Sequence, residues 1–105
     1  MAPDPFYETE RIRAARWQTL RNLVPYGHRG GREDRLRGTL ALQELDLSRD
    51  ELRDLLSYLA DLGYLQITED WSGGTDVWRA RLLPLGDDYA HKRCPPVPEI
   101  PRPPE

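Results

Sequence analysis

The sequence predicts a small α+β domain that is mainly helical, on three observations from its 105 residues. Leucines recur at helical spacing between Leu52 and Leu62, which indicates one face of an amphipathic helix. After Gly63 the apolar residues alternate instead, and a second alternating run follows a glycine-rich turn, which is typical of a β-hairpin. Before Pro25 a long segment without glycine or proline favours another helix. We therefore expect three helices, a hairpin and a short closing helix.

The first helix is expected from about Glu8 to Val24, and Pro25 ends it because proline cannot continue the helical hydrogen bonds. Before Trp17 the apolar pattern is less regular, so we expect the first two turns to extend beyond the core. The apolar face of this helix consists of Trp17, Leu20, Leu23 and Val24.

A glycine-rich segment separates the first helix from the second. Three glycines within residues 27–31 favour an irregular, mobile loop, because glycine has few steric restrictions. The second helix should then begin with Glu33 and Asp34 in its first turn, where carboxylates complement the helix dipole. Leu36 and Leu40 should point inward.

The third helix has a specific start signal. Ser48 and Glu51 form an S-x-x-E capping box, in which each side chain pairs with the other residue's backbone amide. Gly63 should end the helix in a left-handed conformation. With the second helix and a short turn, this segment has the spacing of a helix-turn-helix. The inward stripe consists of Leu52, Leu55, Leu56, Leu59 and Leu62.

The hairpin should turn at residues 72–74, Ser-Gly-Gly, and Pro84 should end its second strand. A last helix, about Leu85 to Lys92, is expected to carry Tyr89 onto the body of the domain. The inward-facing strand residues should be Leu65, Ile67, Trp78, Ala80 and Leu82.

These elements define one domain at residues 8–92, after a flexible N-terminus at residues 1–7 and before a proline-rich extended tail at residues 93–105. Six prolines in that tail lack amide donors, and large apolar groups are few, so we expect it to be dispensable for folding. A domain of this size is modestly stable, which makes a homodimer a reasonable expectation.

Charge is strongly segregated although the net charge is −3. Residues 11–37 hold eight arginines against two acids, whereas residues 44–76 hold nine acids against two arginines. The single cysteine predicts a reducing compartment, and the absence of a signal-like start or a long apolar run predicts a cytoplasmic protein without membrane contact.

Catalytic and metal-binding patterns are missing from the sequence. His28 lies in the glycine segment, and His91 and Cys94 lie near the tail, so nothing positions them for chemistry. There is no C-x-x-C, H-x-x-x-H or H-E-x-x-H spacing and no glycine-rich phosphate loop with a flanking strand. We expect no enzyme activity, no cofactor and no metal.

Several short stretches occur in an order that resembles a winged-helix domain. The layout of the whole chain is similar to that of the small winged-helix proteins of Mu-like prophages. Leu83 stands where many winged-helix regulators have a threonine in L-T-x-x-G, so the start of the last helix departs from that pattern. The stretches are residues 16–24, 48–62, 62–65 (Leu-Gly-Tyr-Leu), 82–86 (Leu-Leu-Pro-Leu-Gly) and 96–98 (Pro-Val-Pro).

This resemblance implies a DNA-binding protein, a transcriptional regulator of phage or prophage type, with the third helix in a major groove and the hairpin on the backbone. On the third helix and the hairpin, the side chains able to contact DNA are Arg49, Arg53, Ser57 and Arg79. A separate arginine cluster that could hold a phosphate backbone consists of Arg29, Arg32, Arg35 and Arg37.

A protein-interaction module, an adaptor or inhibitor without DNA binding, is the alternative function. Asp50, Asp54 and Asp61 lie on the outward face of the third helix, where they would repel phosphates and attract a basic protein partner. Trp71 is expected near the hairpin turn, where a large aromatic side chain often marks an interface. The arginine cluster would then be a solvated face or pair with the acidic block of another subunit.

Overall fold

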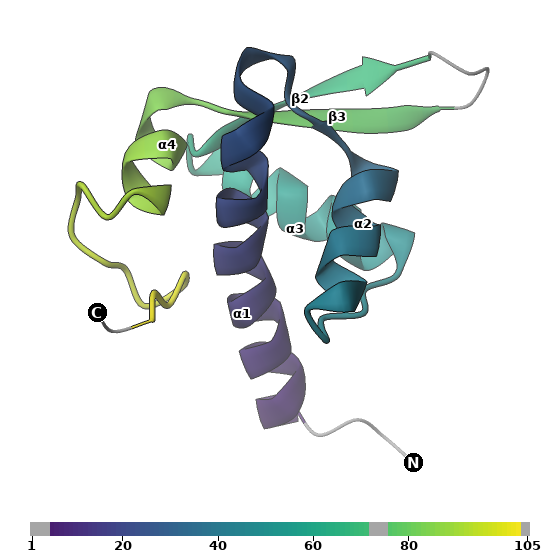
Figure 1. Ribbon diagram of the computed structural model, residues 1–105. Helices are drawn as coiled ribbons and strands as arrows, with labels where there is room; N and C mark the ends of the chain where they lie inside the picture. Colours follow the sequence, from purple (N-terminus) through teal and green to yellow (C-terminus); the bar gives the residue numbers. More distant parts are fainter. Residues whose placement is uncertain (1–4, 72–75, 104–105) are drawn as a thin grey trace.

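The computed structural model describes residues 5–71 and 76–103. Their fold is α+β and mainly helical, and the predicted order of three helices, a hairpin and a short helix is confirmed (Figure 1). The elements are α1 (Pro5–Leu23), the 3-10 helix η1 (Val24–Arg29), β1 (Gly31–Arg32), α2 (Glu33–Leu42), α3 (Arg49–Asp61), β2 (Leu65–Asp70), β3 (Val77–Leu82) and α4 (Pro84–Ala90).

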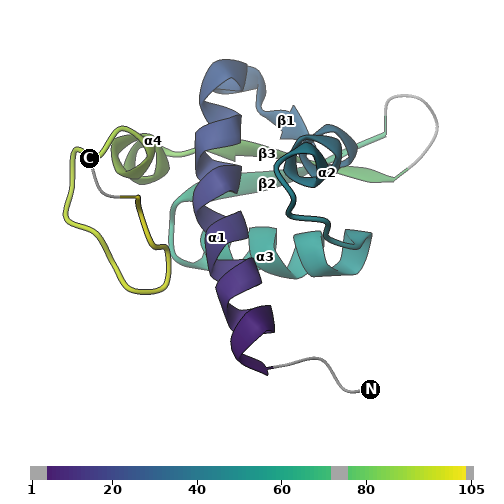
Figure 2. The same cartoon turned by 60° about the horizontal axis from the view of Figure 1, so that its bottom comes forward.

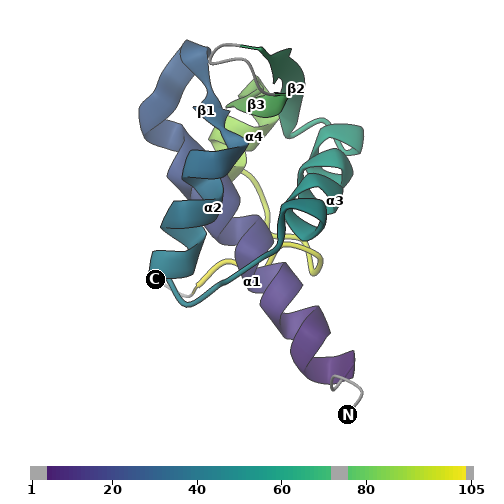
Figure 3. The ribbon, with the colours of Figure 1, turned by 90° about the vertical axis from the view of Figure 1, so that its right-hand side faces the viewer.

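The three strands form one antiparallel sheet in the order β1-β3-β2. Strands β2 and β3 pair from Leu65 opposite Leu82 to Asp70 opposite Val77, which is the predicted hairpin. Its expected turn at residues 72–74 lies outside the described residues. Figure 2 shows α3 beneath β2 and α1 crossing in front of the sheet, and Figure 3 shows α2 and α3 side by side below the strands.

The glycine-rich segment is more regular than the predicted irregular loop, although its backbone leaves the helical conformation at Gly27. It forms η1 and then β1, whose Gly31 pairs with Ala80 of β3. Gly27 and Gly30 have positive φ angles of 57° and 70°, which residues other than glycine rarely adopt. A Cβ atom at Gly30 would collide with the carbonyl oxygen of Ala80. The glycines therefore permit a close approach between two strands.

The core lies between the helices and the inner face of the sheet. Leu36 and Leu40 of α2 are buried, as predicted. Leu62 was expected in the same stripe but is 46% exposed, because α3 ends before it and Leu62 is the C-cap residue. Trp78 is half-buried, whereas a core position was expected. The other core side chains of α1, α3 and the strands include Trp17, Leu20, Leu23, Leu52, Leu55, Leu56, Leu59, Leu65 and Ala80.

The ends of the helices follow their local signals. The capping box of α3 is confirmed, since the amide of Glu51 donates to Ser48 Oγ at 3.1 Å and the amide of Ser48 donates to the Glu51 carboxylate at 3.0 Å. Gly63 has a φ angle of 86°, as predicted for a left-handed helix end. Helix α1 begins at Pro5, so residues 5–7 are helical although the sequence predicted flexibility there.

The chain after α4 packs on the domain, contrary to the prediction of a tail without firm contacts. Ile100 is fully buried, and Val97 packs against the core. The hydroxyl of Tyr89 donates to the carbonyl oxygen of Ile100 and accepts from the amide of Val97 at 3.0 Å. The guanidinium of Arg102 lies 4.7 Å from the centre of the Tyr89 ring. Two apolar side chains and one tyrosine thus hold a proline-rich segment in place.

Candidate functional site

Four arginines gather around one cleft of about 360 Å³, which we name the arginine cleft. It lies where η1, β1, the first turns of α2 and strand β3 meet, so the formation of η1 and β1 is what assembles it. Arg29, Arg32 and Arg35 were predicted to cluster, and the structure adds Arg79 from a strand that lies 44 residues or more away in sequence. The lining residues are Pro25, Tyr26, Arg29, Gly30, Arg32, Arg35 and Arg79.

Two of these arginines are also structural. Arg79 pairs with Asp70 at 2.8 Å and donates to the carbonyl oxygens of Arg29 and Gly30, at 3.2 and 3.1 Å. Arg32 pairs with Asp34 at 3.3 Å, and its guanidinium lies 3.9 Å from Asp70. The hydrogen bond to Arg32 and its charge hold the pKa of Asp34 below its ordinary value. Arg79 therefore fastens η1 to the sheet while it lines the cleft.

The remaining two arginines of the cleft are exposed and uncompensated. Within the described part of the chain, the side chains of Arg29 and Arg35 form no ion pair or hydrogen bond. Among the described residues, Asp34 and Asp70 provide the two carboxylates paired at this cleft, against four guanidinium groups. The cleft retains an excess of positive charge and donors in the fork geometry that fits phosphate.

Arg37 belongs elsewhere, although the sequence grouped it with the others. It lines a separate cleft of about 220 Å³ on the other flank of α2, together with Arg49 and three acidic residues. The separation follows from helical geometry, since residues two apart on a helix do not face each other. The acidic residues of this second cleft are Glu33, Asp34 and Asp76.

Arg53, predicted to contact DNA, is instead part of an internal ionic cluster. Its Nη2 lies 2.6 Å from the carboxylate of Glu33, which is 4% exposed, and its guanidinium lies 4.5 Å from the centre of the Trp78 ring. The amide of Trp78 donates to Glu33 at 3.1 Å. The side chain of Arg53 is only 19% exposed, so it joins α3 to α2 and β3 rather than facing a ligand.

The cluster shifts the ionisation of Glu33. Burial raises the pKa of the Glu33 carboxyl, but the hydrogen bonds from Arg53 and the Trp78 amide, and the charges of Arg53 and Arg49, outweigh it. The pKa therefore lies below its ordinary value, and the carboxylate is the stable form in the fold. No local sequence signal indicates this cluster, because the partners of Glu33 lie 20 and 45 residues away.

The outward face of α3, which we name the acidic face, keeps its carboxylates free. Asp50, Asp54 and Asp61 are exposed and form no ion pair with any described residue. Ser57 lies half-buried on this face. Arg49, the second arginine of α3, donates to the carbonyl oxygen of Asp76 at 2.7 Å and so holds the chain just before β3. Because the arginines of α3 are held by partners within the fold, the unpaired charges on the acidic face are carboxylates.

The side chains considered for chemistry or for an interface are dispersed. Trp71 is 63% exposed at the end of β2, His28 is exposed on η1, and Cys94 is a half-buried free thiol. His91 Nδ1 lies 2.8 Å from the carbonyl oxygen of Asp87. Among residues 5–71 and 76–103, no three histidine, cysteine or acidic side chains are placed to hold a metal ion. No helix in these residues combines the length and apolar character that crossing a bilayer requires.

Comparisons with known proteins do not narrow the function. No protein-family model, curated protein sequence or solved structure matches the chain significantly. The arginine cleft and the acidic face each carry charged side chains that form no ion pair with a described residue.

Proposed function

We propose that the chain is a winged-helix domain that binds the sugar-phosphate backbone of duplex DNA through its arginine cleft. The order of helices and hairpin, with β1 added to the edge of the sheet, supports the winged-helix assignment. The resemblance to small winged-helix proteins of Mu-like prophages extends the proposal to a transcriptional regulator of phage or prophage type.

One observation carries this function: two uncompensated arginines, Arg29 and Arg35, stand at a cleft that two further arginines line. Neutralising phosphates releases counterions from DNA, which supplies most of the affinity in backbone binding. Arg79, held by Asp70 and by the carbonyl oxygens of Arg29 and Gly30, keeps the shape of the cleft without a ligand. Preorganised donors lose little conformational entropy on binding.

The acidic face argues against the usual insertion of the third helix into a major groove. Asp50 and Asp54 would lie against phosphates, and Arg53 is occupied by Glu33. Contacts to phosphate and sugar position a protein on DNA but do not read its sequence. The proposed complex is therefore dominated by backbone contacts, with α3 turned away from the duplex and little preference among sequences.

A titration of a duplex of about 20 base pairs, followed by fluorescence anisotropy over a range of salt, tests the proposal. Each phosphate contact contributes about 0.9 to the slope of log affinity against log salt, so Arg29→Gln and Arg35→Gln should each reduce the slope by about one unit. Arg13→Gln, which removes the same charge from α1 at its contact with Glu10, is the matched control and should leave the slope unchanged. Equal losses in all three variants, or no salt-sensitive binding by the wild-type chain, would refute the proposal.

The acidic face favours a second candidate, a protein-interaction module for a basic partner. Three exposed carboxylates along α3 could contact lysines or arginines of such a partner, and Trp71 could add apolar area. A defined probe, a peptide of alternating lysine and alanine, should then bind the wild-type chain and lose affinity in Asp50→Asn and Asp54→Asn. If DNA binding is the function, the same two variants should bind the duplex at least as tightly as the wild type, because α3 faces away from the duplex and they remove negative charge without removing a contact.

A further inference from the structure

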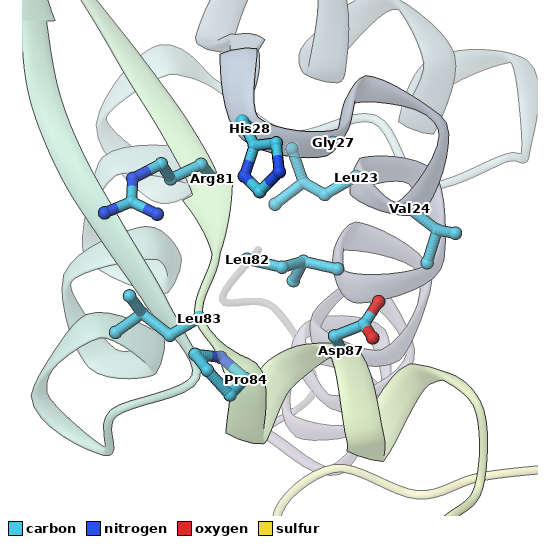
Figure 4. Close-up of a pocket in the computed structure, with 9 residues that line it drawn as sticks. All are labelled: Leu23, Val24, Gly27, His28, Arg81, Leu82, Leu83, Pro84 and Asp87. Atoms are coloured by element: carbon cyan, nitrogen blue, oxygen red, sulfur yellow. The ribbon is translucent and has the colours of Figure 1, made fainter.

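A second cleft, of about 350 Å³, opens between η1, the end of β3 and the start of α4, and we name it the apolar cleft (Figure 4). It shares η1 with the arginine cleft but uses other residues of it. Its volume lies at the lower end of the range for small-molecule sites, which is roughly 300 to 1,000 Å³. The lining residues are Leu23, Val24, Gly27, His28, Arg81, Leu82, Leu83, Pro84 and Asp87.

The floor and walls of the apolar cleft are aliphatic. In Figure 4, Leu23 and Leu82 lie between η1 and β3 and Pro84 lies at the lower edge, whereas the side chain of Leu83 is directed to the other side of β3. Gly27 keeps one side open, since a Cβ atom there would meet nothing within 4 Å. An apolar ligand body would replace water against this surface, and the hydrophobic effect would favour its entry.

The charged groups at the mouth are not balanced. Asp87 is already paired with Arg93, at 2.6 Å, and lies 3.4 Å from the ring of His91. Arg81 and His28 have no ion pair or hydrogen bond among the described side chains. In Figure 4 the His28 ring faces Leu82, and Arg81 lies on the rim with its guanidinium directed outward. The mouth therefore offers donors without a partner on one side of an apolar floor.

We propose that the apolar cleft binds a small monocarboxylic acid, with its apolar body on the leucines and its carboxylate at the mouth between His28 and Arg81. A guanidinium on a flexible stem reaches a carboxylate at the rim and pairs with it in bidentate geometry. An imidazole has an N–H donor in either neutral tautomer. A ligand amine in the same place would face the charge of Arg81, which excludes it. This site is independent of whether the chain binds DNA.

NMR titration of the full-length, ¹⁵N-labelled chain tests the proposal with four probes of matched size or charge: hexanoate, hexanol, hexylamine and acetate. Hexanoate should shift the amides of Gly27, His28, Arg81 and Leu83 in a saturable way. Hexanol should bind about tenfold more weakly, because it lacks the charge-assisted hydrogen bonds. Acetate, which lacks the apolar body, and hexylamine should cause no saturable shift.

Two variants separate the charge of the site from its apolar floor. Arg81→Gln should lower the affinity for hexanoate about tenfold and leave that for hexanol unchanged. Leu82→Ala should weaken both probes by a similar factor, because Leu82 lies within the cleft and the change removes apolar area only. Arg35→Gln, which removes one charge from the arginine cleft, is the control and should change neither affinity. Equal binding of hexanoate and hexylamine, hexanoate binding unchanged in Arg81→Gln, or shifts that map to the arginine cleft would overturn the proposal.

Discussion

The arginine cleft and the acidic face contain the same kinds of side chain but differ in which charges are left over. At the arginine cleft, Asp70 pairs with both Arg32 and Arg79, so guanidinium groups outnumber the carboxylates that pair with them. On α3 the reverse holds, because Arg53 pairs with Glu33 and Arg49 donates to the carbonyl oxygen of Asp76. Each surface therefore presents the charged side chains that have no ion-pair partner within the fold.

This difference shows why formal charge along a sequence overstates what a partner meets. Exposed ion pairs contribute little to stability, but they neutralise charge that would otherwise act at a distance. Arg53 counts toward the charge of α3 in the sequence, and in the fold it is directed inward onto Trp78. The uncompensated residues, such as Arg35 and Asp54, are therefore the ones on which binding experiments should concentrate.

Both surfaces rest on one core, and the largest expected effect comes from removing part of it. Truncation after Arg93 deletes the fully buried Ile100 and leaves the hydroxyl of Tyr89 without its partners. Removing a buried aliphatic side chain costs about 2 to 5 kcal/mol, so we expect a loss at the upper end of that range. Chemical denaturation measures it.

A chain truncated after Pro103 retains both Ile100 and Arg102 and is the matched control. It should unfold close to the wild-type denaturant concentration. Equal stability of the chain truncated after Arg93 and the wild type would mean that the packing of the tail adds nothing to the core that carries the two surfaces.

Glu33→Gln tests this difference directly. It removes the carboxylate that neutralises Arg53, so the positive charge of Arg53 again counts toward the net charge of α3. The glutamine still accepts from the Trp78 amide, but the largely buried guanidinium of Arg53 loses its ion-pair partner. Removing one partner of a buried pair costs about 3 to 5 kcal/mol, and the partial exposure of Arg53 places the expected loss near 3 kcal/mol. Denaturation of Glu33→Gln, Arg53→Met and the double variant gives the coupling energy.

If the pair has the role described, the double variant should be more stable than the sum of the two single losses predicts. Additive losses would show that Glu33 and Arg53 act separately. In that case the acidic character of α3 would not depend on the internal pair.

The stability of the cluster should depend on pH in one direction. The pKa of Glu33 lies below its ordinary value of 4.5, so its contribution is complete above that pH and is lost as the pH falls through the lower, folded-state pKa. The pKa of Glu51 is lowered as well, by its hydrogen bond to the Ser48 amide and its pair with Arg11. We expect a flat melting temperature from about pH 7 to about pH 5 and a fall below it. Glu33→Gln should flatten that fall, and an equally steep fall in the variant would contradict the assignment.

Much of the fold could be predicted because its signals are local. The capping box of Ser48 spans one helical turn, and the stripe from Leu52 to Leu59 repeats within a single helix. The parts that sequence reasoning missed depend on partners far along the chain. Gly31 forms a strand only because Ala80 is available to pair with it, and Ile100 is buried only because Tyr89 lies beside it.

The candidate site was predictable only in part for the same reason. The clustering of Arg29, Arg32 and Arg35 follows from their spacing, and the exposure of Trp71 follows from its place beside the hairpin turn. The occupation of Arg53 by Glu33 does not, since 20 residues separate the two and no periodicity connects them. A residue's charge can be read from sequence, whereas its partner requires the fold.

The smallest expected effect concerns the start of the acidic face, at Ser48. Ser48→Ala removes the acceptor for the Glu51 amide, and loss of such a cap costs about 1 kcal/mol. The loss should stay near this value, because Glu51 still accepts from the Ser48 amide and still pairs with Arg11. Ser48→Asp keeps an acceptor at the cap and places a negative charge at the positive end of the helix dipole, so it should retain wild-type stability.

Urea denaturation of both variants makes the comparison, and equal losses in the two would show that the side chain of Ser48 does not hold the first turn of α3. If Ser48→Ala instead cost several kcal/mol, α3 would depend on its cap for folding, and the position of Asp50 and Asp54 on the acidic face would be less secure than the hydrogen bonds of Glu51 indicate.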